Sequence, residues 1–195
     1  CPPADAWLST FKQHPDLFTH VIPLAFHVDY WDWLGWADRF SSEAFSNRQR
    51  AYVRQRSLSH LYTPGILVNS EEWRPWFKGV RNWPKSQRTP GVLSLQVNDS
   101  NVQLSFDSAL ALTANVAVIG VGVQSEIRNG ENRGKSLTHD FVVLHHFAQP
   151  LTSTANFKIP NKAIFADAQK LALVAWVSVE DNNHIIQAVA GYWPK

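Results

Sequence analysis

The side chain best suited to covalent chemistry in this sequence is the thiol of its single cysteine, Cys1. Residues 4–11 predict a helix, because Pro2 and Pro3 stand where a helix needs no N–H donor and Asp5 falls in its first turn. A thiol at such a helix start lies near unpaired backbone N–H groups, which stabilise the reactive thiolate. Cys1 is therefore a candidate catalytic residue, and an unreactive cysteine is the alternative.

The densest group of polar and aromatic side chains lies at the end of an apolar run, residues 21–28. Its members are His27, Asp29, Tyr30, Trp31, Asp32, Trp33 and Trp36. The end of a buried strand is where α/β sheets place their binding sites. We therefore interpret the group as a substrate-binding lip, whose rings hold a peptide or apolar ligand while Asp29 or Asp32 assists proton transfer. The competing interpretation is a structural loop whose tryptophans cover the core or contact a second domain.

A metal site is the rival chemistry for the same region. The credible ligands for zinc or another divalent ion are His27, Asp29, Asp32 and His60. Their spacing matches no known ligand pattern, so the sequence predicts neither a metal centre nor another cofactor. His145 and His146 are adjacent in an expected strand, so their side chains point to opposite faces and cannot easily share an ion.

The first half of the chain has the pattern of an α/β fold. The apolar run at residues 21–28 suits a strand that is covered on both faces, although Pro23 weakens this prediction. Ser41 or Ser42 can cap a helix that extends to about residue 56. The Thr63-Pro64-Gly65 sequence then breaks the chain before a short strand at residues 66–69, and a further helix is expected at residues 73–83.

The pattern changes after residues 84–91, which have the composition of a linker. We therefore expect two domains, residues 1–87 and residues 88–195. Seven short strands with turn residues between them predict an antiparallel β-sandwich-like second domain. They are expected at residues 92–97, 102–106, 114–124, 139–147, 154–159, 171–180 and 185–192, with a turn at residues 129–134 that places Gly130 and Gly134 at positive φ.

Several segments together resemble the secreted thioredoxin-like bacterial family catalogued as domain of unknown function 1223. They are CPPAD at residues 1–5, AFHVDYWD at 25–32, LGW at 34–36, RQRAY at 48–52, YTP at 62–64 and NGEN at 129–132, followed by Gly134, Leu137, His139 and Val142-Val143. The resemblance implies a thioredoxin-like α/β domain, whose first strand is missing from this sequence, joined to the all-β domain. It also implies that Thr63 and Pro64 form a cis-proline loop facing the active cysteine.

Members of that family usually carry Cys-Ser-Ser-Cys before the Pro-Pro-Ala-Asp, so Cys1 would match the second, resolving cysteine of a pair. The first cysteine is absent from these residues, and we infer that the natural chain continues upstream. The resemblance implies an exported thiol–disulfide oxidoreductase, periplasmic or secreted, that acts on protein or small-molecule thiols and disulfides. The alternative is a non-catalytic exported binding protein that uses the aromatic lip at residues 30–36.

Charge and hydropathy favour neither a nucleic-acid partner nor a transmembrane segment. The net charge of +2 comes from 18 basic and 16 acidic residues that are spread without a dense basic run, so nothing favours nucleic acid. No stretch reaches the roughly 18 consecutive apolar residues that a transmembrane helix needs. The sequence does not indicate the substrate or the oligomeric state.

Overall fold

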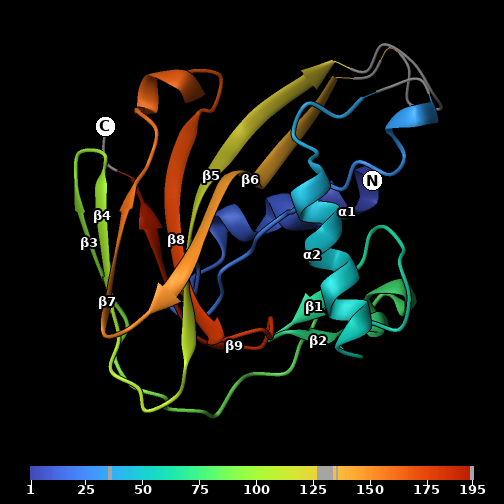
Figure 1. Cartoon of the computed structure of the whole chain (residues 1–195). Coiled ribbons are helices and arrows are strands. Elements are labelled where there is room, and N and C mark those ends of the chain that lie inside the picture. The colour runs from blue at the N-terminus through green and yellow to red at the C-terminus, as the bar shows by residue number, and fades with distance from the viewer. Residues whose placement is uncertain (35–36, 127–133, 135, 194–195) are drawn as a thin grey trace.

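Two antiparallel sheets form the second half of the chain in the computed structural model, which describes residues 1–34, 37–126, 134 and 136–193 (Figure 1). The larger sheet has the strand order β6-β5-β8-β9 and the smaller one β3-β4-β7. The strands are β3 (Ser94–Asn98), β4 (Asn101–Ser105), β5 (Leu112–Glu126), β6 (Ser136–Leu151), β7 (Thr154–Lys158), β8 (Lys170–Val179) and β9 (Ile185–Tyr192). All seven predicted strands are confirmed, with small changes at their ends.

The larger sheet is covered on both faces. Val116 and Val118 of β5 pack into a core shared with the smaller sheet, whereas Ala117 and Ile119 pack into a second core with residues of the N-terminal half, Phe11 among them. A strand that is buried on both faces reads as a continuous apolar run. This is why residues 116–121 lack polar alternation.

The prediction of a thioredoxin-like α/β domain is wrong. The structure is mostly β, with two short α-helices and three antiparallel sheets in the described residues. The N-terminal half contributes α1 (Pro2–Thr10), α2 (Glu43–Arg54), the two-residue strands β1 (Leu67–Val68) and β2 (Glu71–Glu72), and the 3₁₀ turns η1 (Phe11–Gln13), η2 (Asp32–Leu34) and η3 (Arg74–Lys78). A fourth 3₁₀ turn, η4 (Lys162–Phe165), lies between β7 and β8. The predicted domain boundary near residue 87 stays a prediction.

The expected strand at residues 21–28 reduces to two isolated bridges, Leu17 with Val21 and Ala25 with Val142. At the second, the Ala25 N–H donates to the Phe141 carbonyl (2.8 Å) and the Ala25 carbonyl accepts from the Val143 N–H (2.9 Å). Two residues earlier, Pro23 has no N–H to continue such a ladder. The segment therefore lies along β6 without forming a strand of an α/β sheet.

The two helices begin as the sequence predicts, and the third does not form. Ser42 caps α2, since its hydroxyl accepts from the Phe45 N–H at 3.2 Å. The helix expected at residues 73–83 is only the 3₁₀ turn η3, which ends where Gly79 takes a left-handed φ of 80°. Gly134 also has the predicted positive φ, 79°, whereas residues 129–133 lie outside the described part of the chain. No helix within the described residues is long and apolar enough to span a membrane.

One buried carboxylate joins α1 to the larger sheet. The side chain of Asp140, in β6, is fully buried and accepts from the Ser9 hydroxyl (2.5 Å) and the Gly122 N–H (2.8 Å), and it pairs with the Lys12 ammonium (2.8 Å). Gly122 sits at a bulge of β5 with a φ of 70°, a conformation that suits glycine. The bulge and the start of the chain are thus fixed to the same side chain.

We expect Asp140→Ala to lower the free energy of unfolding by about 1–3 kcal/mol, because it leaves the buried Gly122 N–H without its acceptor and removes the ion pair with Lys12, whose side chain is 37% exposed. Urea denaturation measures the loss. Asp140→Asn keeps an acceptor and loses the charge, so its stability should lie between those of the wild type and Asp140→Ala. Asp107→Ala, at an exposed position, is the matched control and should change stability by no more than about 0.5 kcal/mol. An Asp140→Ala protein as stable as this control would contradict the anchoring role.

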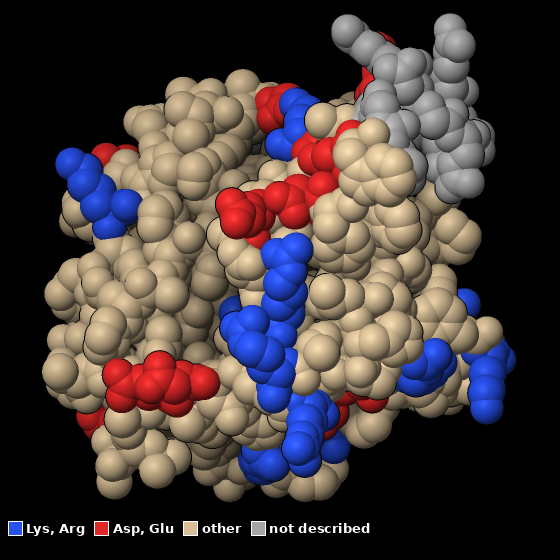
Figure 2. Space-filling view, turned by 45° about the vertical axis from the view of Figure 1, so that its right-hand side comes forward, with Lys and Arg blue, Asp and Glu red and all other residues tan. Residues whose placement is uncertain are grey.

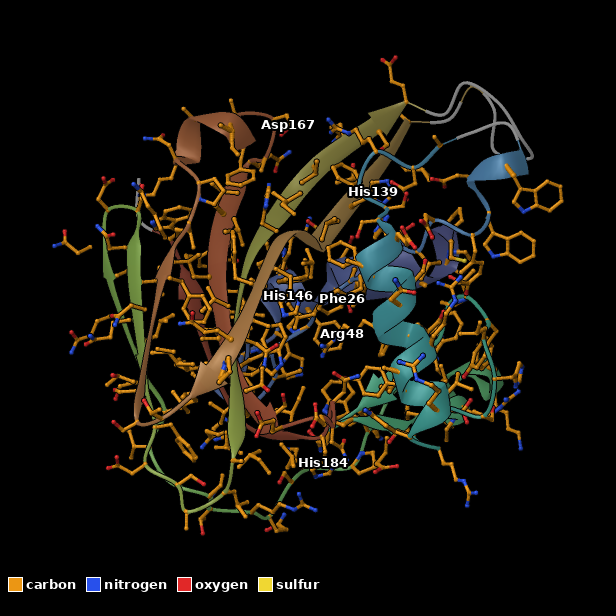
Figure 3. The ribbon with its side chains drawn as sticks, in the orientation of Figure 1. Phe26, Arg48, His139, His146, Asp167 and His184 are labelled. Carbon is orange, nitrogen blue, oxygen red and sulfur yellow. The ribbon has the colours of Figure 1, made fainter. Side chains whose placement is uncertain are left out.

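A second cluster joins α2 to the sheet, and Figure 3 shows its Phe26, Arg48 and His146 side chains between them. The His146 ring stacks on Trp176 (5.1 Å between centroids), and the Arg48 guanidinium lies 4.9 Å from the Phe26 ring and 5.3 Å from that of Trp176. The His146 Nε2–H donates to the Asn115 Oδ1 at 3.0 Å. Burial, together with the nearby Arg48 charge, lowers the pKa of His146 to about 4.

This low pKa predicts a loss of stability in mild acid. Between pH 6.5 and about 4 the unfolded chain binds a proton at His146, whereas the folded chain does not. The contribution of His146 to the free energy of unfolding is therefore complete above pH 6.5. It falls by up to about 3 kcal/mol as the pH is lowered toward 4. Denaturation at several pH values should show a smaller fall for His146→Gln, which keeps a donor and cannot titrate. The exposed His20→Gln is the control. Parallel pH profiles for wild type and His146→Gln would refute this account.

Candidate metal centre

Four side chains from separate parts of the chain meet beside the first turn of α1. They are Asp5 of α1, His27 and Asp38 of the loop between α1 and α2, and His139 of β6, and we call them the His–Asp cluster. Figure 3 shows His139 on the upper part of β6, away from His146 and Arg48. The cluster is therefore distinct from the packing beneath α2.

The fold brings Asp5 and His139 together. Because the Gly122 bulge shifts the register of β5, His139 pairs with Val123. Its neighbour Asp140 holds α1 in place, so the Asp5 Oδ1 lies 3.3 Å from the His139 Nδ1. His139 is only 3% exposed, whereas the Asp5 side chain is partly accessible.

The loop supplies the other pair. His27 follows the bridge between Ala25 and β6, and its Nδ1 lies 2.5 Å from the Asp38 Oδ2. In the tautomer whose Nδ1–H donates to this carboxylate, the Nε2 atom carries the lone pair of the ring. The His27 and His139 ring centroids are 5.4 Å apart, and the Phe40 ring packs against both. Phe40 therefore shields the two imidazoles on one side.

Two atoms of the cluster are buried with no hydrogen-bond partner among the described residues, the Asp5 Oδ2 and the His139 Nε2. Buried polar atoms almost always have a partner, so each such atom needs an explanation. Asp5, His27 and His139 each offer one potential ligand atom, and these three atoms lie within 4.8 Å of one another. The arrangement suits a shared cation.

The carboxylates of the cluster are held in their charged form. Burial acts to raise the pKa of Asp5, but the hydrogen bond with His139 and the nearby positive charges outweigh it and leave the pKa below its usual value. For Asp38 burial is again the largest influence, and the hydrogen bond with His27 outweighs it, so this pKa is also lowered. One carboxylate and two imidazoles are a donor set that suits a divalent transition metal, and the second carboxylate, Asp38, holds one of the imidazoles.

The predicted catalytic residues are Cys1, Thr63 and Pro64. Cys1 is exposed and caps α1 without a side-chain hydrogen bond. The Thr63–Pro64 peptide bond is cis, as the resemblance implied. No hydrogen bond joins Thr63 or Pro64 to Cys1 within the described residues. Their role in catalysis stays a prediction.

The side chains of the predicted substrate-binding lip fall into two groups, polar ones that hydrogen-bond within the protein and aromatic rings that are exposed. Asp29 accepts from the Ser46 hydroxyl at 2.5 Å, and Tyr30 donates to the Gln49 Oε1 at 3.0 Å. Asp32 accepts from the Ser41 hydroxyl (2.8 Å) and the Asp38 N–H (3.3 Å). These side chains fix the loop that carries Asp38. Trp31 and Trp33 are 49% and 76% exposed, and Trp36 lies outside the described residues.

Of the ligands considered from sequence, only His27 belongs to the cluster. Asp29 and Asp32 hold the loop, and His60 contacts Ser59 and Tyr62 at the surface. His145 and His146 contact different rings, Phe165 and Trp176, as expected for neighbours on opposite faces of a strand. Sequence reasoning did not identify Asp5, Asp38 or His139 as ligands. Its only indication was that Asp5 and His139 belong to the segments that carry the family resemblance.

A cavity of about 450 Å³ opens on the other side of Phe40, between α2, β6 and η4. The salt bridge between Arg39 and Asp167 (2.6 Å) lies along its wall. Figure 2 shows basic side chains in a line down one face of the molecule with acidic side chains at the upper end, so neither sign dominates that face.

Together, fold and site define a mostly β protein in which a His–Asp cluster joins a helix, a loop and a strand. The chain belongs to the family described as protein of unknown function (DUF1223), whose match covers residues 1–178. It is similar to the crystal structure of protein AGR_C_4864 from Agrobacterium tumefaciens, with 21% identity and a TM-score of 0.62, over 97% of this chain and 86% of that one. At this identity the likeness concerns the fold alone. No curated protein matches the chain.

The lowered pKa of Asp38 predicts a loss of stability in strong acid. Its charged form is favoured in the folded chain, so its contribution is present above the unfolded value of about 3.8 and is lost as pH falls below it. Denaturation at pH 5 and at lower pH should therefore show a smaller acid-induced loss for Asp38→Asn than for wild type. The exposed Asp107→Asn should keep the wild-type slope. An unchanged slope in Asp38→Asn would show that its pairing with His27 adds no stability.

Proposed function

We propose that this protein binds a divalent transition-metal ion, Zn²⁺ or an ion of similar preference, through Asp5, His27 and His139. The observation that carries the proposal is a pair of buried atoms without a hydrogen-bond partner, Asp5 Oδ2 and His139 Nε2, in a group whose three ligand atoms lie within 4.8 Å of one another. The Asp5 Oδ2 has one ionic contact, with the Cys1 nitrogen at 3.5 Å. Two imidazoles and one carboxylate are a common ligand set for zinc and for iron(II).

The surroundings of the cluster support the same conclusion. Metal-binding histidines usually donate their second N–H to a carboxylate or carbonyl oxygen, which fixes the tautomer and orients the ring. Asp38 holds His27 in this way. The Phe40 ring on the two imidazoles limits access of water, which strengthens the electrostatic attraction for a cation.

The redox hypothesis has less support. Cys1 is the only cysteine of the 195 residues, so they contain no cysteine pair, and the fold that implied one is not the fold observed. The alternative of a binding protein stays a prediction, and the exposed Trp31 and Trp33 rings are its support. Export from a bacterial cytoplasm remains part of the proposal and rests on the family resemblance.

Zinc titration against a chromophoric chelator tests the proposal. We expect one ion per chain, with binding that weakens as pH falls because protons compete for the imidazoles. His27→Ala and His139→Ala should abolish this binding, and Asp38→Asn should weaken it about 10- to 100-fold. The exposed His20→Ala is the matched control and should bind as wild type does.

Stoichiometric binding in each of the variants His27→Ala and His139→Ala would contradict the proposal. The absence of binding by a folded wild-type protein would also contradict it. Circular dichroism of each variant separates loss of the site from loss of the fold.

A further inference from the structure

Cys1 lies on the same face of α1 as Asp5, because residues four apart are neighbours on a helix. The Cys1 carbonyl accepts from the Asp5 N–H at 3.0 Å, and the Cys1 nitrogen is 3.5 Å from the Asp5 Oδ2. This oxygen is one of the two buried atoms without a hydrogen-bond partner. The backbone of Cys1 thus lies beside the proposed metal ligand.

The Cys1 thiol is exposed and outside the three-ligand group in the present rotamer. A cysteine side chain has a single rotatable bond to its sulfur, with three staggered positions, so a change of χ1 alone redirects the thiol. The helix N-terminus beside it stabilises the thiolate that a metal requires. Position, reach and charge therefore all favour approach of the sulfur to the cluster.

We propose that Cys1 supplies a fourth, thiolate ligand to the metal held by Asp5, His27 and His139, an inference that rests on the proposed function. The step forms one metal–sulfur bond and releases the thiol proton to solvent, with no change of oxidation state. A thiolate added to two imidazoles and a carboxylate favours Zn²⁺ over iron(II) or Mg²⁺. Four protein ligands also close the coordination sphere, which is the arrangement of a structural zinc site.

Cobalt(II) substitution tests this ligand directly, since a cobalt–thiolate bond gives an intense charge-transfer absorption in the near ultraviolet that nitrogen and oxygen ligands do not give. The wild-type chain with one equivalent of Co²⁺ should show this band, and Cys1→Ser should lose it while still binding Co²⁺. Because Cys1 is exposed and is the only cysteine of these 195 residues, the substitution should leave the fold of this chain unchanged and its signal unambiguous.

Thiol alkylation gives a second readout. Saturating Zn²⁺ should slow the reaction of Cys1 with iodoacetamide about tenfold or more, because the metal-bound sulfur is no longer a free thiolate. In His139→Ala the protection should disappear.

The outcomes separate the two proposals. Cobalt binding without the charge-transfer band, a band that persists in Cys1→Ser, or alkylation that Zn²⁺ does not slow would overturn the thiolate ligand and leave the three-ligand site. Failure of Co²⁺ and Zn²⁺ to bind the folded wild-type chain would overturn both.

Discussion

The buried carboxylate of Asp140 is the interaction on which the arrangement of the site depends. Three groups converge on it, the Ser9 hydroxyl and the Lys12 ammonium from the N-terminal segment and the Gly122 N–H from the bulge of β5. A desolvated carboxylate without such partners would be costly, so the segment, the bulge and β6 must form together. The adjacent His139 then faces Asp5 across this junction.

A second set of polar contacts completes the site from the loop side. Asp29 and Asp32 bind hydroxyl groups at the start of α2 and just before it, and so fix the segment that carries Asp38 and Phe40. The Ala25 bridge to β6 fixes the other end of the loop next to His27. The chain thus uses short-range hydrogen bonds to bring a loop histidine to a strand histidine, and the result is a compact group of donors for one cation.

Local pattern was sufficient to predict the strands and the two α-helices. Apolar and polar residues alternate in β4, which has one buried face, and Ser42 is a typical helix cap. The fold class was not predictable in the same way. The apolar run at residues 21–28 has the composition of a buried strand, and it is covered by packing against the larger sheet, with Pro23 preventing continuous pairing. The composition of a segment indicates that it is buried, but it does not indicate which element packs against it.

The site was predicted only in part, for the same reason. His27 was recognisable because it lies in a dense polar group, but its partners are set by tertiary structure. Asp5 and His139 are 134 positions apart, so no spacing in the sequence indicates that they meet. They come together because of the bulge at Gly122 and the hydrogen bonds and ion pair of Asp140, which no local sequence pattern predicts.

The most direct test of this account is anomalous X-ray diffraction from crystals of the protein soaked in Zn²⁺, recorded on both sides of the zinc absorption edge. The account predicts one strong anomalous peak between Asp5, His27 and His139, at about 2.0–2.2 Å from a ligand atom of each. A peak at other histidines only, or no peak in a crystal with an accessible cluster, would contradict it.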